Sequence, residues 1–536
     1  MVYADIGNRM NLMLDLDHDN RYTGYCGSNL LPGSYKVTIV AIDKAGNAAK
    51  DESGRIVIRD PSDLNGNGIE DSLEGDVSGS KDLRVIVLHD GNLTNVASPQ
   101  EQKLKILPGS ALTISGDKLE KIAKTKGVKG IYQDQKLRVM ASPGTGQATP
   151  ASINDPRKYG KLTGKGVTVA LIDTGADASH ESLAGRIVAF KDFVNNQSAP
   201  YDDNGHGTHC ASLIAGGDGL GVAPDARLVV VKVMDRDGAC FLSDALKALD
   251  WCLENKDRYG IKVVSFSVGG ENPSEGASLL DDACNKMVEK GLVMCVAAGN
   301  SGPAPGTIVI PGDAKNVITV GAIDSSGSIF EQSSRGPEGS EEIKPDLVTL
   351  GVDVVSALMG SKNGRSSMSG TSMAVPQVSG SVAVLLEAKP DLGPADVKRA
   401  LLKTADDLGP SGPDNAYGYG AMDLTDALQS LDAPRGTLSA PDLGNVTLNN
   451  NEGYVGEPVM IAAPASGEIE TVDAKIMGPD RQLEIPMNDI DGNSVYSARW
   501  ETSFWTPGSY QVEVKMQGKF GEEATRVVPF RLLGKG

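Results

Sequence analysis

The sequence predicts an α/β fold with a doubly wound, mostly parallel sheet. Residues 167–172 and 293–298 are two nearly continuous apolar runs of strand-forming residues, which is typical of strands buried on both faces of a parallel sheet. Asp173 follows the first run directly, and Asn300 follows the second run after a single glycine. Both polar residues are therefore expected at the carboxyl ends of their strands, where open α/β sheets build their sites.

Two helical segments each begin beside a polar motif. Residues 204–209 read Asn-Gly-His-Gly-Thr-His, and a helix is expected over 208–215. Residues 369–374 read Ser-Gly-Thr-Ser-Met-Ala, and Ser372 opens a helical run that continues through residue 386. A serine at the amino end of a helix lies beside free backbone N–H groups and the positive end of the helix dipole, and both favour an oxyanion.

Asp173, His206 and Ser372 are the candidate catalytic acid, base and nucleophile. Serine is a poor nucleophile at neutral pH, so an imidazole must take its proton and a carboxylate must hold that imidazole in the correct tautomer. The side-chain amide of Asn300 is expected to donate to the oxyanion together with the backbone N–H of Ser372. The order of these residues alone is weak evidence, because any long chain contains it, and their local contexts make it strong.

On these motifs, residues 150–430 resemble the subtilisin-like serine proteases. The motifs that carry the resemblance are DTG at Asp173, NGHGTHCAS at His206, AAGN at Asn300, SGTSMA at Ser372, GVAPDA at 221–226 and VITVGA at 317–322. The resemblance implies a serine endopeptidase that hydrolyses polypeptides without a catalytic cofactor. The alternative is a pseudoprotease that keeps only the scaffold, but such a protein would normally have lost one of the four catalytic groups.

The resemblance also implies the position of the pocket for the P1 side chain, the substrate residue just before the cleaved bond. Its implied substrate-binding residues are Gly238, Ser267, Val268, Gly269, Ala297, Ala298, Gly299 and Val309. Subtilisins often close the bottom of this pocket with a glycine, and this chain carries Val309 there. Its isopropyl group should make the pocket shallower, so a broad, mainly apolar P1 preference is expected, with Ala, Leu or Met favoured over Phe and Tyr.

An internal repeat predicts β-sandwich appendages at both ends of the chain. Residues 32–47 read PGSYKVTIVAIDKAGN and residues 507–522 read PGSYQVEVKMQGKFGE, each with the alternation of a strand. The carboxyl-terminal copy is expected to be a complete sandwich, whereas the amino-terminal copy begins too late to contain the earlier strands. The chain is therefore expected to start inside a domain. Chance similarity of two hairpins is the alternative.

Residues 63–74 match the loop of an EF-hand, with a glycine at loop position 6. Calcium, a hard cation, needs a high density of oxygen ligands, and this loop predicts a structural calcium site. The candidate ligands are Asp63, Asn65, Asn67, Ile69, Asp71 and Glu74. The alternative is a polar Asn-Gly linker without a metal.

Residues 83–140 resemble the inhibitory propeptides of subtilisins, which implies a small α+β domain and a self-processing zymogen. The residues that follow, 141–147, are rich in Ser, Pro, Gly and Thr and predict a flexible, cleavable linker. The expected domains are a partial sandwich over 1–60, a linker with the calcium loop over 61–82, the propeptide over 83–140, the catalytic domain over 141–432 and a sandwich over 433–536.

Composition and charge limit the possible partners. The chain has 536 residues and a net charge of −19, which argues against nucleic acid and against an anionic membrane surface as partners. The sequence contains no apolar stretch of about 18 residues, so no transmembrane helix is predicted. No signal peptide is visible, but one could lie upstream, so a secreted or cell-surface location is expected. A second hypothesis for the function is a surface adhesion protein whose protease domain only processes itself.

Overall fold

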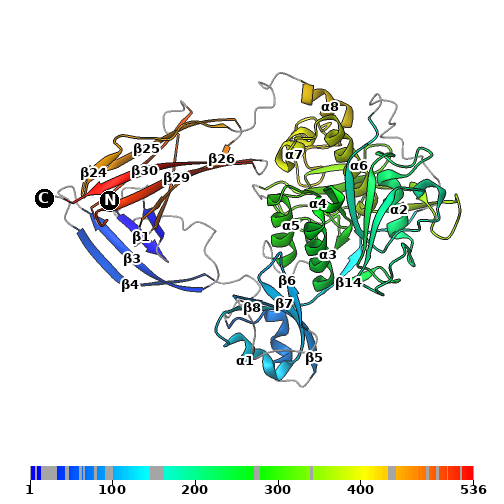
Figure 1. Ribbon diagram of the computed structural model, residues 1–536, viewed down its shortest axis with the longest axis horizontal. Coiled ribbons are helices and arrows are strands. Elements are labelled where there is room, and N and C mark those ends of the chain that lie inside the picture. Colours follow the sequence, from blue (N-terminus) through cyan, green and yellow to red (C-terminus); the bar gives the residue numbers. More distant parts are fainter. Residues whose placement is uncertain are drawn as a thin grey trace. The chain divides into compact units, whose positions relative to one another are not determined.

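In the computed structural model the chain forms two compact units, one of residues 61–434 and one that combines residues 1–60 with 435–536. The structure describes residues 2–6, 9–13, 33–42, 48–58, 63, 67–77, 81–90, 101–144, 162–270, 278–338, 342–432, 442–467, 469–478, 482–489, 494–503, 505–519 and 522–534 (Figure 1). Among these residues, no helix is both long and apolar enough to cross a membrane.

A seven-stranded parallel sheet forms the centre of the 61–434 unit, in the order β12-β13-β11-β15-β17-β18-β19. Its strands are β11 (Thr168–Asp173), β12 (Ile187–Asp192), β13 (Arg227–Lys232), β15 (Ile261–Phe266), β17 (Val293–Ala297), β18 (Ile318–Ile323) and β19 (Leu347–Leu350). Every residue of β11 and β17 is buried, as their apolar runs predict. The strand order reverses beside β11, so the carboxyl end of β11 lies at a switch point of the sheet.

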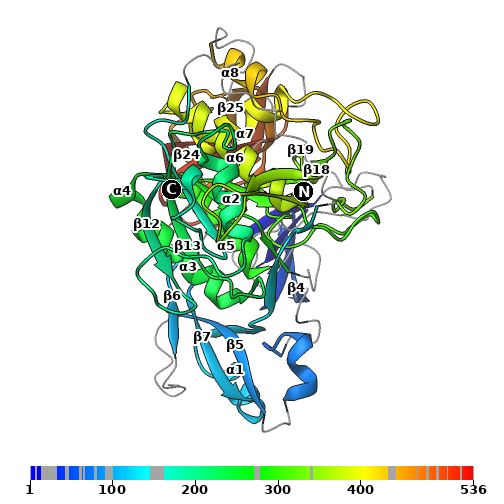
Figure 2. The same cartoon turned by 90° about the vertical axis from the view of Figure 1, so that its right-hand side faces the viewer.

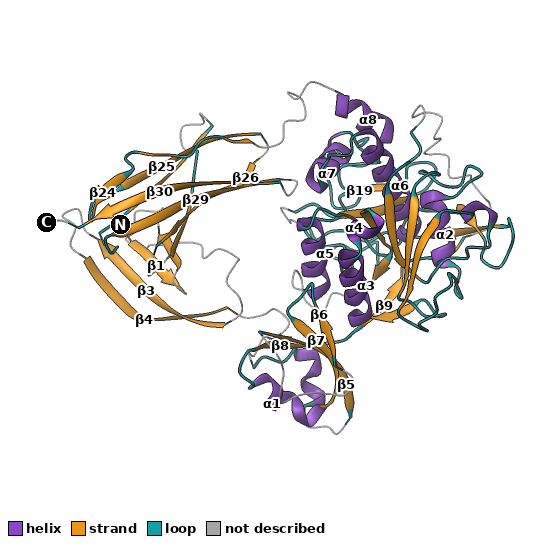
Figure 3. Cartoon of the chain, viewed as in Figure 1, coloured by secondary structure: helices purple, strands orange, loops and turns teal. Residues whose placement is uncertain are grey.

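Helices cover both faces of this sheet (Figures 2 and 3). Helices α2 (His206–Ala215) and α6 (Thr371–Ala388) pack together on one face, and α3 (Leu242–Glu254) and α5 (Leu279–Glu289) pack together on the other. The remaining helices of this part are α4 (Lys256–Tyr259), α7 (Pro394–Lys403) and α8 (Leu424–Asp432). The doubly wound α/β fold predicted from the sequence is therefore confirmed.

Both helices that carry catalytic motifs begin slightly earlier than the sequence predicts. Helix α2 starts at His206 rather than at residue 208, and α6 starts at Thr371. The residue before each helix is a glycine with a positive φ, 105° at Gly205 and 146° at Gly370. A side chain would disfavour these backbone conformations, so glycine lets the chain turn sharply into each helix.

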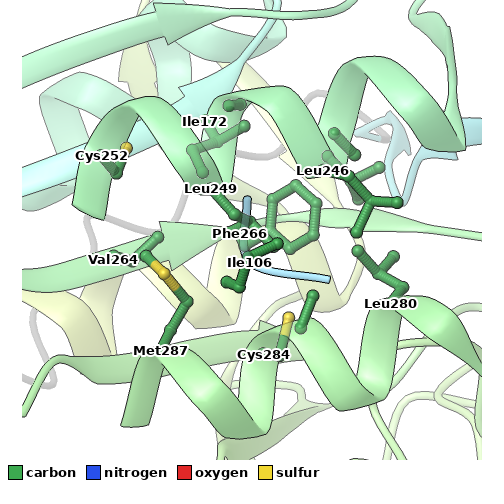
Figure 4. Close-up of a cluster of buried hydrophobic side chains, with 14 of the residues drawn as sticks. Ile106, Ile172, Leu246, Leu249, Cys252, Val264, Phe266, Leu280, Cys284 and Met287 are labelled. Carbon is green, nitrogen blue, oxygen red and sulfur yellow. The ribbon is translucent and has the colours of Figure 1, made fainter. Parts of the chain in front are cut away.

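Residues 81–90 and 101–133 form a small α+β layer that packs on α3 and α5. Its four-stranded sheet has the order β6-β7-β5-β8 and a short helix, α1 (Figure 1). The elements are β5 (Asp82–His89), β6 (Gln102–Leu104), β7 (Gly109–Ser115), α1 (Leu119–Ala123) and β8 (Val128–Gln133). The next strand, β9 (Lys136–Val139), belongs to a separate sheet. Ile106, in the turn after β6, belongs to the same buried cluster as Leu249 of α3 and Leu280 of α5 (Figure 4).

The segment expected as a linker over 61–82 is folded onto this layer where the structure describes it. Ile69 and Leu73 are 1% and 2% exposed and pack with Val85, Leu112 and Ile131. The backbone N–H of Glu70 donates to Ile131 O at 2.8 Å, and Ile131 N donates to Gly68 O at 3.0 Å. Because two apolar side chains enter the core of the α+β layer, residues 67–77 are part of that layer and not a free connection.

The second unit contains a two-sheet β-sandwich over residues 442–533. One sheet has the order β24-β30-β29-β26-β27, and the other joins β22, β25, β23 and β28. The strands are β22 (Asp442–Leu443), β23 (Thr447–Leu448), β24 (Glu452–Tyr454), β25 (Val459–Ser466), β26 (Ile469–Met477), β27 (Gln482–Pro486), β28 (Val495–Trp500), β29 (Gly508–Gly518) and β30 (Glu523–Leu533). Trp500 lies at the centre, with ring centroids 5.2 Å from Trp505 and 5.3 Å from Phe530.

The same unit contains a four-stranded sheet from the amino-terminal part of the chain. Its order is β2-β1-β3-β4, and every neighbouring pair is antiparallel. The strands are β1 (Val2–Ile6), β2 (Arg9–Met13), β3 (Gly33–Ile42) and β4 (Ala48–Ile58). Residues 1–60 thus share a compact unit with the carboxyl-terminal sandwich, although they lie at opposite ends of the sequence.

Candidate active site

Asp173 and His206 form a buried pair at the carboxyl end of the central strand. Asp173 ends β11, and His206 is the first residue of α2. The imidazole Nδ1 lies 2.7 Å from Asp173 Oδ1, and both residues are nearly inaccessible, at 3% and 0% exposure. A carboxylate can accept a hydrogen bond from Nδ1 only when Nδ1 carries the hydrogen. This contact therefore fixes the tautomer in which Nε2 is free to accept a proton.

Asp202 holds the start of α2 in place, a role that the sequence did not predict. Its carboxylate accepts hydrogen bonds from the backbone of Asn204, Gly205 and Thr208 and from the hydroxyl of Thr174. Burial alone would raise the pKa of Asp202, but these bonds, with that from the Thr208 hydroxyl, outweigh it and hold the pKa below its ordinary value. The Asp202 side chain therefore stays ionised and ties the turn at Thr174 to the helix that carries His206.

Ser372 lies at the amino end of α6, as predicted. Its hydroxyl donates to Ser267 O at 3.1 Å and accepts from Met140 N at 3.1 Å. Among the described residues the hydroxyl makes no hydrogen bond to His206. Cys210 of α2 contacts both residues, since its Sγ is 4.0 Å from His206 Nε2 and 3.5 Å from the backbone carbonyl oxygen of Ser372. Catalytic hydrogen bonds are often formed only in the reacting complex, so the hydroxyl must turn from Ser267 O towards His206.

The Ser372 N–H and the Asn300 side chain both lie near one carbonyl oxygen, that of Met140. Ser372 N donates to Met140 O at 3.2 Å. Asn300 Oδ1 accepts from Thr371 N and Thr371 Oγ1, each at 3.0 Å, so Asn300 Nδ2 is turned away from Thr371. A Cβ built on Gly370 would lie 2.4 Å from Met140 O and 2.7 Å from Asn300 Nδ2, so both atoms crowd the same point. The two groups that are expected to donate to the oxyanion therefore both lie close to the Met140 carbonyl.

Residues 136–143 contain two strands, β9 and β10 (Ser142–Pro143), on either side of Met140. Strand β9 pairs antiparallel with β14 (Ala239–Phe241) on one side and with β16 (Val268–Gly269) on the other. Beyond residue 140, β10 pairs antiparallel with β21 (Arg365–Ser369), which also pairs with β20 (Val354–Ala357). Val139 N donates to Gly238 O at 3.0 Å, so the predicted binding residue Gly238 contacts this strand. The segment is therefore paired with neighbouring strands both before and after Met140, whose backbone contacts Ser372.

The end of the Met140 side chain lies close to Gly269, which also neighbours Val309. A Cβ on Gly269 would lie 2.5 Å from Val309 Cγ2 and 3.1 Å from Met140 Cε. A Cβ on Gly299 would lie 2.8 Å from both Val309 methyl groups. Val309 N donates to Ala298 O at 3.0 Å, which holds Val309 against the wall that Ala297, Ala298 and Gly299 form. Val309 therefore fills space between two glycines that could carry no side chain there.

The other titratable groups near the pair are unsuited to the same chemistry. His209 is fully buried, and burial lowers its pKa to about 3, so it stays neutral while its Nε2 contacts Val354 O at 3.1 Å. Burial likewise raises the pKa of Cys210 well above its ordinary value, so its thiol keeps its proton. The described cysteines 210, 240, 252, 284 and 295 are all buried and free. Among these groups, Ser372 remains the candidate nucleophile.

The candidate calcium loop is described except for residues 64–66, so Asn65 lies outside the described residues. The Asp63 carboxylate accepts from Asn67 N at 3.1 Å and from Gly68 N at 2.7 Å. Asn67 Nδ2 donates to Glu74 Oε1 at 2.8 Å, so side chains from loop positions 1, 5 and 12 converge. Ile69 is buried, and Asp71 begins the 3-10 helix η1 (Asp71–Asp76). This oxygen-rich turn fits a hard cation such as calcium.

Comparison with known proteins identifies the family. The model of the subtilase family matches residues 164–420. The serine protease AprX of Bacillus subtilis is 36% identical over 338 residues, which cover 57% of this chain and 76% of AprX. Subtilisin DY of Bacillus licheniformis is 37% identical over 272 residues, which cover 50% of this chain and 92% of that protein. With this match in sequence, the chain belongs to the subtilase family and is a subtilisin-like serine endopeptidase.

Proposed function

We propose that the chain is made as a zymogen that cuts itself first between Met140 and Ala141. The observation that carries this proposal is the Met140 carbonyl, which accepts from Ser372 N at 3.2 Å beside Asn300. Strand β9 before this bond and strand β10 after it are both paired with walls of the cleft. A substrate bound across the nucleophile has this form, with its carbonyl where the oxyanion develops.

In the proposed reaction, Ser372 attacks the carbonyl carbon and His206 takes the hydroxyl proton. Asp173 holds the Nδ1–H of His206 and stabilises the imidazolium that forms. Ser372 N and Asn300 Nδ2 donate to the oxyanion. The imidazolium then passes its proton to the leaving amine, which is Ala141 in self-processing and the P1′ residue of a polypeptide substrate afterwards.

The proposed inhibitor is residues 83–140, which include most of the α+β layer, assisted by the packed segment 67–77. Two carboxylates, one in residues 83–140 and one in α3, link this part of the chain to α3 through hydrogen bonds. Asp134 accepts from Ser243 N and Ser243 Oγ, each at 2.8 Å, at the start of α3. Asp250 of α3 accepts from Lys105 N at 2.9 Å and from Ile106 N at 2.6 Å. Together with buried Ile106, these contacts favour retention of the cut propeptide in the cleft.

The cut should be visible as a new amino terminus at Ala141. Mass spectrometry of the purified chain over time is expected to give fragments 1–140 and 141–536. Met140→Leu should process at a similar rate, because Leu fits an apolar pocket, whereas Met140→Asp should slow processing by 100-fold or more since an ionised group would be buried. A first cut after residue 147 in the unaltered chain would contradict the proposal.

We also propose that Val309 sets the P1 preference towards Met, Leu and Ala. Val309→Gly should shift the ratio of kcat/KM for matched Phe and Leu peptides towards Phe by about 5- to 150-fold, which corresponds to relief of about 1–3 kcal/mol of overpacking. Val309→Ile is the matched control and should keep or strengthen the preference for Leu. Equal cleavage after Phe and Leu in the unaltered enzyme, unchanged by Val309→Gly, would refute the steric argument.

Calcium binding by residues 63–74 is proposed from the convergence of Asp63, Asn67 and Glu74. A bound ion would hold the turn that leads Ile69 and Leu73 into the core of the propeptide layer. Calcium at 100 times its dissociation constant should stabilise that layer by about 2.7 kcal/mol. In calorimetric titration, Glu74→Gln should abolish the binding heat while Asp76→Asn, outside the loop pattern, should keep it. Equal heats for both variants would contradict the site.

The proposed substrates are extracellular polypeptides, and a secreted location is part of this proposal. No feature of the described residues favours the alternative of an adhesion protein that only trims itself. A fluorophosphonate probe followed by a peptide-cleavage assay on the processed form separates the two. Labelling of Ser372 together with repeated turnover of added peptides is expected, and labelling without turnover would favour the alternative.

A further inference from the structure

The two β-modules at the ends of the chain have the same strand arrangement. The amino-terminal sheet has the order β2-β1-β3-β4, and four strands of the carboxyl-terminal sheet have the order β27-β26-β29-β30. In both, every neighbouring pair is antiparallel, and the order of the strands along the chain is the same. Strand β2 is thus the counterpart of β27.

The register of the strands supports this correspondence residue by residue. Gly33 of β3 pairs with Ile58, and Gly508 of β29, which begins the same Gly-Ser-Tyr sequence, pairs with Leu532. Ala4 pairs with Ile39, and Ala474 pairs with Val514, at matching distances from the two glycines. Aligned in this way, β1 reads Val-Tyr-Ala-Asp-Ile and residues 472–476 read Val-Asp-Ala-Lys-Ile. The structure therefore extends the repeat beyond the two segments that the sequence comparison found.

The two modules meet through counterpart strands. β2 and β27 each stand at the end of their sheet, and these two strands contact each other. Contact between the same edge of two copies of one module is the arrangement of a two-fold symmetric dimer. The two strands belong to separate sheets, and no hydrogen-bonded ladder joins them among the described residues, so the contact brings two end strands side by side.

This contact has a consequence for the processed protein. Residues 1–60 belong to one unit with 435–536, whereas residues 61–140 belong to the other unit with the catalytic domain. A cut after Met140 therefore leaves two fragments, 1–140 and 141–536, each of which contributes to both units. We propose that the β2–β27 contact is a second attachment that keeps the cut propeptide tethered to its own protease. The functional part of this inference rests on the proposed self-cleavage after Met140.

Two attachments joined by one chain hold far better than either alone. When the propeptide leaves the cleft, the β2–β27 contact keeps it at a high effective concentration, and such linkage raises overall affinity by about 10²–10⁴. Dilution alone should then fail to activate the processed protein. Activation instead requires a further cut in the chain between the amino-terminal sheet and the propeptide. The contact between the β-modules thus keeps the processed protease inhibited until that cut is made.

The contact is tested without any catalysis in the Ser372→Ala chain. The recognition sequence of an unrelated site-specific protease is inserted between residues 60 and 61 and again between 434 and 435, and an affinity tag follows residue 536. After both cuts, fragment 1–60 is expected to stay with tagged 435–536 in a 1:1 ratio at about 1 μM. Loss of fragment 1–60 on washing would overturn the proposal. The proposal would also be overturned if fragment 1–60 stayed on the resin only together with fragment 61–434.

The tether is tested in the active chain with the insertion at 60/61 only. After self-processing and dilution to nanomolar concentration, the sample that has been cut at 60/61 should gain peptidase activity at least about 100-fold faster than the same sample left uncut. Equal rates would overturn the tether. If no cut after Met140 occurs but 1–60 stays with 435–536 in the inactive chain, the self-processing proposal fails while the module contact stands.

Discussion

Ser372→Ala is expected to abolish peptide hydrolysis and self-processing together. The loss in kcat should be about 10⁶-fold, which is the loss known for this change in subtilisin itself, a member of the family. The physical reason is that no other nucleophile is available beside His206, because burial keeps the Cys210 thiol protonated. The variant should stay folded, since it loses only the bonds that the hydroxyl makes with Ser267 O and Met140 N.

The measurement is peptide turnover and mass spectrometry on the purified variant, with circular dichroism to verify its fold. Ser379→Ala is a matched control in the same helix, because the Ser379 hydroxyl donates to Val375 O within α6 and lies beside Cys295 rather than beside His206. That control should process itself and hydrolyse peptides as the unaltered chain does. Appearance of fragment 141–536 in pure Ser372→Ala protein, with no protease added, would refute the role of Ser372.

Sequence alone predicted the fold and the candidate catalytic residues because their signals are local. Asp173, His206, Asn300 and Ser372 each lie where a buried strand or a helix meets a loop, and the apolar runs that set those boundaries are continuous in the sequence. The glycines at 205 and 370 were visible too, but their effect on helix starts depends on backbone angles that composition does not specify. The helix boundaries were accordingly displaced by one or two residues.

The features that the sequence did not predict are contacts between distant segments. Met140 is placed against Ser372 by the pairing of β9 with β14 and β16, and backbone pairing carries little side-chain information. Asp250 receives backbone N–H groups of Lys105 and Ile106 across 145 and 144 residues of sequence. The contact of β2 with β27 joins the two ends of the chain. The sign in the sequence that pointed to this region was the resemblance of residues 83–140 to an inhibitory propeptide, followed by a flexible linker.

A buried ionic cluster beside the central sheet is a second place where one substitution should have a large effect. Asp346 is 4% exposed and lies 3.0 Å from Lys344 Nζ and 2.9 Å from Lys398 Nζ. The two ammonium groups also donate to carbonyl oxygens of the loop that follows Val309, those of Ala314 at 2.9 Å and Val317 at 2.8 Å. Asp346 thus compensates two buried cations that fix the loop behind the P1 pocket.

Asp346→Asn should therefore destabilise the catalytic domain by about 3–5 kcal/mol, since it leaves buried ammonium groups without their anion. On a Ser372→Ala background, to prevent self-digestion, the melting temperature should fall by roughly 10 °C or more. Asp225→Asn, which removes an exposed partner of Arg186, is the matched control and should change the melting temperature little. Comparable melting temperatures for Asp346→Asn and Asp225→Asn would contradict the role of the cluster.

The dependence of the unfolding free energy on pH in the acid range is an independent test of the same cluster. Burial alone would raise the pKa of Asp346, but Lys344, Lys398 and the N–H of Thr319 outweigh it and hold the pKa below its ordinary value of 3.8. A carboxyl whose pKa is lower in the folded than in the unfolded chain stabilises the fold above the unfolded pKa and loses this contribution as pH falls through the folded pKa. Unfolding free energy measured from pH 6 downwards should therefore fall less steeply below about pH 4 in Asp346→Asn than in its parent. Parallel curves for the two proteins would mean that Asp346 is not held ionised by its two lysines.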